Sequence, residues 1–352
     1  MTSKHSVVLF PGLLLTAALC ATVLSGCSQP TNSGPMIALL LPESRTARYE
    51  AFDRPFFEQR IAELGDYTVL YSNADQDAAK QQSQAEAALA SGASVLVLNA
   101  VDSAAAVSIV IAANAQGVPV IAYDRPIEGG ELAYFVSFDN ERIGELQAEA
   151  LIDKLEADGA DGGILVVNGS PTDGNAREFK AGASMVVDAS GYEVLAQFDT
   201  PDWNPTKAQD WVAGQITAYP DQISGVYAAN DGTAGGAIAA LKAANIEPFP
   251  IVTGQDAELA GIQRIVSGDQ YMTIYKDMRI QAQLAAEIAV TLANGGSVSS
   301  ELEINGTPTT LLEAQIVTVD NIEETLIADG FFTVAQICTA EYAAACARAG
   351  IK

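Results

Sequence analysis

Residues 94–125 read SVLVLNAVDSAAAVSIVIAANAQGVPVIAYDR, and this stretch decides the fold. An apolar run at 94–98 is followed by a helical pattern over 102–116, and a second apolar run covers 118–122. Short apolar runs bounded by Gly and Pro are typical of strands that are buried on both faces. The order strand, helix, strand with short connections predicts a parallel sheet with helices on both of its faces.

The same alternation continues in both directions along the chain and divides into two series. The first series begins with the apolar run at 36–41. Further strands are expected at 67–71 in the first series and at 163–167, near 194, at 225–228, at 251–253 and at 272–274 in the second. At about 150 residues per domain, a chain of 352 residues holds about two domains. We therefore expect an α/β protein with two doubly wound parallel-sheet lobes.

The two series also resemble each other in the polar residues that follow their strands. In the first series these are Asn99 and Asp124, 25 positions apart, and in the second they are Asn230 and Asp256, 26 positions apart. Ligands of parallel α/β sheets bind at the carboxyl ends of the strands. We therefore expect a ligand-binding cleft between the two lobes.

The composition excludes several classes of function. The chain has 18 basic and 44 acidic side chains, a formal net charge of −26, and 49% hydrophobic residues. This apolar share is ordinary for a folded protein, and the acidic balance argues against nucleic acid as a partner. His5 is the only histidine, so we expect neither histidine catalysis nor a metal site. We also expect no cofactor, because Gly232, Gly235 and Gly236 lack the order of a dinucleotide fingerprint.

The first residues are typical of an export signal. An apolar run over 7–23 is short for a membrane span, and it ends in Leu24-Ser-Gly-Cys27, which resembles a bacterial lipobox. A chance Cys beside an ordinary cleavage site is the alternative. We expect a signal peptide at 1–26, a lipid anchor on Cys27 and a tether at 27–35. The protein would then be exported and anchored to the outer face of the cytoplasmic membrane, in a periplasmic or extracellular location.

Two cysteines, Cys338 and Cys346, remain in the body of the chain. Export permits a disulfide between them. Eight residues of straight helix would separate their Cα atoms by about 12 Å, which exceeds the roughly 7 Å that a disulfide tolerates. A bridge therefore requires a turn within residues 339–345, and two reduced thiols are the alternative.

Ten residues at the expected strand ends form the candidate ligand site. Their planar carboxylate, amide and guanidinium groups suit the paired hydroxyls of a sugar ring, and their aromatic rings suit its apolar C–H faces. Their cations and acids can neutralise each other around an uncharged ligand. Each residue could instead be structural, as a strand-end ion pair or a helix cap. The ten are Arg48, Tyr49, Asp124, Arg125, Asp173, Asn175, Trp203, Asn230, Asp256 and Lys276.

Five motifs follow one another along the chain: AYDR at 122–125, SFDNE at 137–141 followed by GELQ at 144–147, SP at 170–171 with Asp173 and Asn175, NDGTAGG at 230–236, and GQD at 254–256 with AGI at 260–262. In this order and with this spacing they resemble the D-xylose-binding receptors of bacterial ABC importers, which belong to the periplasmic-binding protein type I family. The resemblance covers residues 36–331 and implies that the family's sugar contacts fall on nine of the ten residues. Tyr49 stands where the family usually has Trp.

The resemblance also implies two lobes joined by three crossovers, near Ser137-Phe138, near Lys276-Asp277 and near Gly306. The expected first lobe is 36–137 plus 277–306. The expected second lobe is 138–276 plus 307–352, which includes the cysteine-containing tail.

The function that the resemblance implies is binding without chemistry. A monomer would capture a monosaccharide, D-xylose above all, between its lobes and deliver it to an ABC permease. A receptor for a chemosensory or sensor-kinase partner, or a binder of ribose, arabinose or glucose, is the alternative. A glycosidase using Asp124 and Asp256 is disfavoured, because the neighbouring Arg125 should lower rather than raise an acid's pKa.

Overall fold

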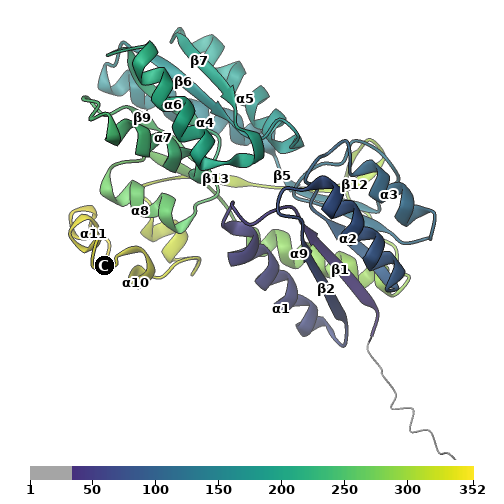
Figure 1. Cartoon of the computed structure of the whole chain (residues 1–352). Helices are drawn as coiled ribbons and strands as arrows, with labels where there is room; N and C mark the ends of the chain where they lie inside the picture. Colours follow the sequence, from purple (N-terminus) through teal and green to yellow (C-terminus); the bar gives the residue numbers. More distant parts are fainter. Residues whose placement is uncertain (1–33) are drawn as a thin grey trace, which may run out of the picture. The chain divides into compact units, whose positions relative to one another are not determined.

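In the computed structural model, which describes residues 34–352, β1 (Met36–Leu41) lies inside a seven-stranded sheet. Its odd-numbered side chains pack with α1 (Arg54–Leu64) and α9 (Met278–Ala293) on one face. Its even-numbered side chains pack with α2 (Ala78–Ala90) and α3 (Val107–Asn114) on the other face (Figure 1). Because helices cover both faces of the strand, polar and apolar residues cannot alternate along it. Its sequence is therefore a continuous apolar run.

The seven strands lie in the order β11-β12-β5-β4-β3-β1-β2, and all neighbours are parallel except β11 and β12. The bounds of the other six strands are Thr68–Asn73 for β2, Ala93–Leu98 for β3, Val120–Tyr123 for β4, Tyr134–Phe138 for β5, Leu302–Ile304 for β11 and Thr307–Leu312 for β12. This sheet and its helices form the first lobe.

The second lobe is built around a four-stranded parallel sheet in the order β7-β6-β8-β9. Its strands are β6 (Gly163–Asn168), β7 (Val194–Asp199), β8 (Ile223–Ala228) and β9 (Ile251–Val252). Helices cover both faces, and two separate apolar cores again flank the central strands. The helices are α4 (Asn140–Asp158), α5 (Gly174–Ser190), α6 (Pro205–Ala218), α7 (Asp231–Ala243) and α8 (Leu259–Ser267), with the short η2 (Pro201–Trp203) before α6.

The internal resemblance of the two lobes extends to their topology. The order β2-β1-β3-β4 of the first lobe is repeated as β7-β6-β8-β9 in the second. β10 (Met272–Lys276) pairs antiparallel with β13 (Ala314–Thr318), and it continues the second sheet through hydrogen bonds from Tyr271 N to Val252 O and from Ile274 N to Gly254 O, 2.9 and 3.1 Å long. The prediction of two doubly wound parallel-sheet lobes joined by three crossovers is confirmed.

One predicted crossover is misplaced. The chain passes between the lobes after β5 and before α9, as expected, but the third passage is not near Gly306. β12 pairs in parallel with β5 of the first lobe, and β13 pairs with β10 of the second. The passage therefore occurs at Glu313, between β12 and β13, and residues 307–312 belong to the first lobe.

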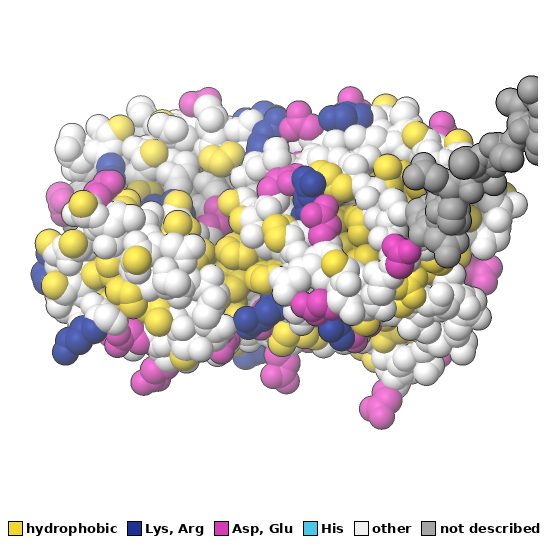
Figure 2. Space-filling model, turned by 90° about the horizontal axis from the view of Figure 1, so that it is seen from below, with side chains coloured by type: hydrophobic (Ala, Val, Ile, Leu, Met, Phe, Trp, Pro, Cys, Tyr) yellow, Lys and Arg dark blue, Asp and Glu magenta, His cyan; other side chains and the backbone are white. Residues whose placement is uncertain are grey.

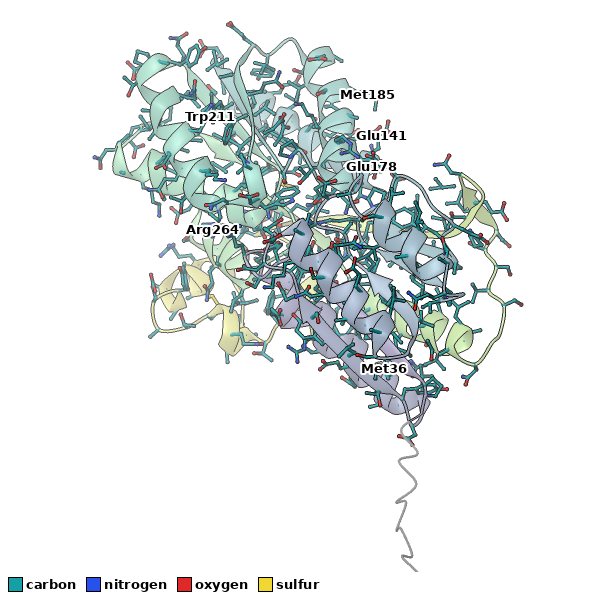
Figure 3. The ribbon with its side chains drawn as sticks, turned by 45° about the vertical axis from the view of Figure 1, so that its right-hand side comes forward. Met36, Glu141, Glu178, Met185, Trp211 and Arg264 are labelled. Atoms are coloured by element: carbon teal, nitrogen blue, oxygen red, sulfur yellow. A yellow bond between two sulfur atoms is a disulfide. The ribbon has the colours of Figure 1, made fainter. Side chains whose placement is uncertain are left out.

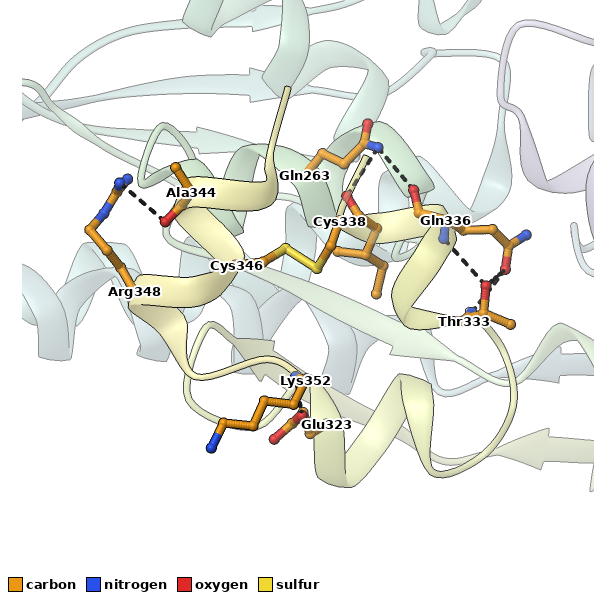
Figure 4. The surroundings of a disulfide bond; sticks show 10 residues. Gln263, Glu323, Thr333, Gln336, Cys338, Ala344, Cys346, Arg348 and Lys352 are labelled. Atoms are coloured by element: carbon orange, nitrogen blue, oxygen red, sulfur yellow. Dashed lines mark hydrogen bonds between the residues drawn. A yellow bond between two sulfur atoms is a disulfide. The ribbon is translucent and has the colours of Figure 1, made fainter. Parts of the chain in front are cut away.

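The chain ends in a tail that is closed by a disulfide between Cys338 and Cys346 (Figure 4). The predicted turn is present, because α10 (Val334–Ile337) ends before Cys338 and α11 (Ala343–Ala349) starts five residues after it, which leaves the Cα atoms 5.9 Å apart. The tail packs its apolar side chains on α8, and Gln263 of α8 donates hydrogen bonds to the Gln336 and Ile337 carbonyls. The π-helix η3 (Glu323–Ile327) precedes this tail and shares its apolar core.

Replacing both cysteines by serine is expected to destabilise this tail. A bridge that closes a loop of this length removes unfolded-state entropy equivalent to about 2–3 kcal/mol. The thermal midpoint of the double variant should fall by a few degrees relative to the unchanged protein, as measured by calorimetry. An equal midpoint for both proteins would mean that the tail unfolds independently of the lobes.

Some sequence predictions fall beyond this structure. The export signal at 1–26, the lipidation of Cys27 and residues 27–33 of the tether lie outside the described residues. Within residues 34–352, none of the helices combines the length and the apolar character that crossing a membrane requires. The face drawn in Figure 2 has Asp and Glu side chains spread along its length with Lys and Arg between them, so on this face the acidic charge is distributed.

Candidate functional site

All ten residues of the predicted site line one small cavity between the lobes, with about 20 Å³ of free space. Each is 5% exposed or less, so the cavity is closed off from bulk water. This space holds about one water molecule, so the lobes have to separate to admit a sugar. The carboxyl ends of the strands of both sheets therefore face a common space.

Both lobes contribute to the cavity. From the first lobe, Arg48 and Tyr49 follow β1 at the start of the π-helix η1 (Tyr49–Asp53), and Asp124 and Arg125 follow β4. From the second lobe come the start of α5 with Asp173 and Asn175, Trp203 in η2, Asn230 as the N-cap of α7, Asp256 after β9, and Lys276 at the end of β10.

Three of these residues have left-handed backbone conformations. The φ angles are +65° at Asp124, +51° at Trp203 and +92° at Asp256. For residues with a Cβ such conformations cost about 1–3 kcal/mol each, and they persist where the surrounding structure over-determines them. The strained backbone at these three positions directs their side chains into the cavity.

Arg48 is fixed by buried partners in the first lobe. Its Nε and Nη2 donate to the two carboxylate oxygens of Asp53 at 2.9 and 2.6 Å, and Nη2 also donates to Gln281 Oε1 at 2.7 Å. Its Nη1 donates to Asp124 Oδ1 at 3.1 Å. The bidentate pair with Asp53 leaves one edge of the guanidinium facing the cavity.

Tyr49 is held between charges rather than free to rotate. Its hydroxyl donates to Asp124 Oδ2 at 3.1 Å and accepts from Arg125 Nη2 at 3.3 Å. The Arg48 and Arg125 guanidinium carbons lie 5.2 and 5.7 Å from the centre of its ring. A Trp at this position could stack in the same way but could not accept a hydrogen bond from Arg125.

Ionic contacts cross from one lobe to the other. Arg125 Nε of the first lobe lies 2.8 Å from Asp173 Oδ2 of the second, and the same oxygen accepts from Trp203 Nε1 at 2.9 Å. Asp256 Oδ1 of the second lobe lies 2.7 Å from Lys276 Nζ and 3.9 Å from Arg48 Nη1 of the first. The Arg125 Nε and Asp256 Oδ1 atoms are buried without an aligned hydrogen bond among the described residues. Both are therefore available to a polar ligand.

The pKa values follow from this network. Burial raises the pKa of Asp124, but Arg48, Lys276 and Arg125 more than offset that effect, so the pKa lies below its ordinary value. Burial raises the pKa of Asp173, against the attraction of Arg125. A lowered pKa keeps Asp124 ionised at neutral pH, which makes it a hydrogen-bond acceptor and an unsuitable general acid.

Several residues that line the cavity were not predicted from the sequence. Thr46, Phe179 and Gln255 also line the cavity. Phe179 lies four residues after Asn175 on α5, so helical periodicity could have found it, and Gln255 sits inside the GQD motif. Asp53 and Glu43, which nothing in the sequence singles out, are buried acids beside Arg48 and Arg125.

The rim of the cavity is closed by hydrogen bonds between the lobes. On one side, Ser103 N donates to Thr172 O at 3.1 Å, and Gly174 N donates to Ser103 Oγ at 3.0 Å. On the other side, Ala47 N donates to Glu258 Oε1 at 3.1 Å. The structure therefore represents the closed form of the cleft. Residues 34–352 contain no cluster of three or more His, Cys, Asp or Glu side chains arranged to hold a metal ion.

Comparisons with known proteins agree with this architecture. A family model described as a periplasmic binding protein domain matches residues 37–297. The D-xylose-binding periplasmic protein of Escherichia coli is 37% identical over 303 residues, which cover 84% of this chain and 90% of that protein. The protein of the same description from Haemophilus influenzae is 36% identical over 328 residues, which cover 91% of this chain and 96% of that protein.

A solved structure is similar over nearly its whole length. The ABC transporter solute-binding protein from Clostridium phytofermentans, crystallised with bound β-D-glucose, has a TM-score of 0.78 and 30% sequence identity. The match covers 86% of this chain and 99% of that one.

Proposed function

This chain belongs to the periplasmic binding protein family, and from that membership we propose that it captures one monosaccharide between its two lobes. The proposed ligand is D-xylose, and the proposed partner is an ABC permease that receives the sugar from the closed protein. The protein acts without a catalytic step, as an exported monomer whose signal peptide spans 1–26 and whose lipid anchor is on Cys27.

The observation that carries this proposal is the lining of the closed cavity. Its guanidinium, ammonium, carboxylate and amide groups offer paired donors and acceptors for vicinal hydroxyls, and the rings of Tyr49 and Trp203 offer apolar faces. Its charges are paired within the protein, which suits an uncharged ligand. The descriptions of the two relatives favour D-xylose, and the glucose-bound structure makes D-glucose the first competitor to test.

The proposed mechanism is closure around the sugar. Because Arg125 and Asp173 belong to different lobes, a ligand that bridges such groups contacts both lobes only in the closed form. The sugar therefore shifts the population toward closure. The hinges are the three crossovers, which assign 36–138 and 277–312 to the first lobe and 139–276 and 313–352 to the second.

Trp203 provides a direct test of binding. The chain has two tryptophans, and Trp211 stacks on Phe198 with ring centres 5.4 Å apart, outside the cavity lining (Figure 3). In a Trp211→Phe variant all tryptophan fluorescence comes from Trp203. We expect D-xylose to change that fluorescence in a saturable manner, because the indole lies against the ligand.

The matching control is a Trp203→Phe variant, which retains Trp211 and should lose the response. Titration with D-xylose, L-arabinose, D-ribose and D-glucose, followed by calorimetry on the unchanged protein, ranks the sugars. Absence of both a fluorescence change and binding heat with every sugar of the panel would refute the proposed function.

A further inference from the structure

Glu258 lies outside the ring of residues that lines the cavity, immediately before α8 of the second lobe. Its Oε1 atom accepts the hydrogen bond from the backbone N–H of Ala47 in the first lobe, 211 residues away in the chain. Ala47 directly precedes Arg48, so this bond ties the second lobe to the segment that carries Arg48 and Tyr49. Glu258 is 8% exposed in this closed form.

The backbone of Glu258 is held in place by Asp231 of α7, which is fully buried. Asp231 Oδ2 accepts from Glu258 N at 2.8 Å and from Thr273 Oγ1 at 3.0 Å, and Oδ1 accepts from Gln270 Nε2 at 2.6 Å. A Cβ at Gly254 or at Gly261 would lie within 2.3 Å of this carboxylate, so the backbone at both positions packs directly on it. Arg264 of α8 donates to the Asp231 carbonyl at 2.6 Å and completes the support.

The charges around Glu258 are mostly negative. Asp231 and Asp256 face it from the second lobe, and Arg264 is the cation that opposes them. On the side of the first lobe its contact is the uncharged Ala47 N–H, and the neighbouring Arg48 is already paired with Asp53 and Asp124. Burial, together with the charges of Asp231 and Asp256, raises the pKa of Glu258 to about 8, and the hydrogen bond from Ala47 N and the charge of Arg264 offset only part of this rise. Burial also raises the pKa of Asp231 to about 7, but the contacts of Asp231 lie within the second lobe and persist when the cleft opens.

We propose that Glu258 is a positioning residue that latches the closed cleft through Ala47, and that closure, because it buries the Glu258 carboxyl group, takes up a proton on this side chain. This inference rests on the proposed function, since closure is what sugar binding is proposed to drive. In the open cleft water hydrates the Glu258 carboxyl group, so its pKa falls toward the ordinary value of a glutamic acid although Asp231 and Asp256 remain beside it, while in the closed cleft burial raises that pKa.

The sign of the effect follows from linkage. A pKa that is raised in the closed form stabilises closure fully below the ordinary pKa of the group, and this stabilisation is lost as the pH rises toward 8. Sugar affinity should therefore fall by at least tenfold between pH 6 and pH 8.5, within the limit of tenfold per pH unit that one proton allows. Above the raised pKa the affinity should become independent of pH.

Glu258→Gln separates the latch from its charge. The amide oxygen of Gln can still accept from Ala47 N, but it does not titrate, so the affinity of this variant for D-xylose should be equal at pH 6 and pH 8.5. Glu258→Ala removes the acceptor and should weaken binding at pH 6 by about fivefold or more, since the Ala47 N–H loses its partner. Glu86→Gln on the exposed surface of α2 makes the same change in net charge and should keep the wild-type pH dependence.

A flat pH profile in the unchanged protein, or a Glu258→Gln variant with the wild-type slope, would overturn the inference. Small-angle X-ray scattering without sugar provides a readout that does not depend on the ligand. The latch predicts a smaller radius of gyration at pH 6 than at pH 8.5 for the unchanged protein, and no such difference for Glu258→Gln. If no sugar binds, the proposed function fails, and the scattering comparison still supports or refutes the latch.

Discussion

Replacing Arg125 by alanine should weaken sugar binding by about 30-fold to several thousand-fold. Arg125 Nη1 donates to Ala100 O at 3.1 Å, Nη2 donates to Tyr49 OH at 3.3 Å, and Nε lies 2.8 Å from Asp173 across the cleft. Removing one partner of a buried, hydrogen-bonded charge pair costs about 2–5 kcal/mol, much of which is the cost of burying the other charge alone. Isothermal calorimetry with D-xylose measures the loss.

Three further variants sharpen this test. Arg125→Lys should also bind poorly, because an ammonium group cannot reach all three partners of a planar fork. Arg142→Ala, on the exposed face of α4, removes the same side chain elsewhere and should leave the affinity unchanged. Asp256→Ala should resemble Arg125→Ala, because it strands Lys276 in the cavity wall. Wild-type affinity in Arg125→Ala or Asp256→Ala would remove that residue from the site.

The sugar-free protein should tolerate Arg125→Ala better than the complex does. Asp173 is in the other lobe, so in an open cleft water can hydrate the carboxylate that the substitution leaves unpaired. The thermal midpoint without sugar should therefore change by only a few degrees. A large loss of stability without sugar would instead mean that the lobes are closed, with Arg125 paired to Asp173, even in the free protein.

The parts of this fold that could be predicted are the strands whose burial on both faces appears in the sequence as a continuous apolar run. β1 is read correctly because both of its faces are covered, so the apolar run is continuous, and the same argument applies to β3 and β6. Polar residues after such strands stand out, and parallel topology brings those strand ends together. Asn230 and Asp256 could therefore be assigned to one cavity without knowledge of any contact.

The parts that could not be predicted depend on contacts between distant segments. The run TPTTLL at 307–312 forms β12, but nothing in its sequence says whether it pairs with β5 or with β10. Asp53 and Glu258 are ordinary acids in the sequence. Their importance comes from partners such as Tyr123 and Ala47, which reach them only after folding and closure.

Gly174 is the position at which a single added methyl group should block closure. It is the first residue of α5, and a Cβ there would lie 2.3 Å from Pro126 Cγ and 3.0 Å from Ser103 Oγ, both in the first lobe. These neighbours are met only when the lobes are together, so Gly174→Ala should not disturb the second lobe itself. Overpacking of this kind costs about 1–3 kcal/mol, which corresponds to a loss of sugar affinity of about 5- to 150-fold.

Gly174→Val should weaken binding further, because its two additional methyl groups would crowd the same atoms of Pro126 and Ser103. Gly214→Ala in α6 is the matched control, since a Cβ there has no atom within 4 Å. The thermal midpoint of sugar-free Gly174→Ala should equal or exceed that of the unchanged protein, because alanine favours a helix over glycine. If the affinity for sugar falls while the thermal midpoint of the sugar-free variant is unchanged, the free-energy cost of the substitution arises in closure alone. Wild-type affinity in both Gly174 variants would mean that the sugar-bound cleft is more open at this rim than the structure described above.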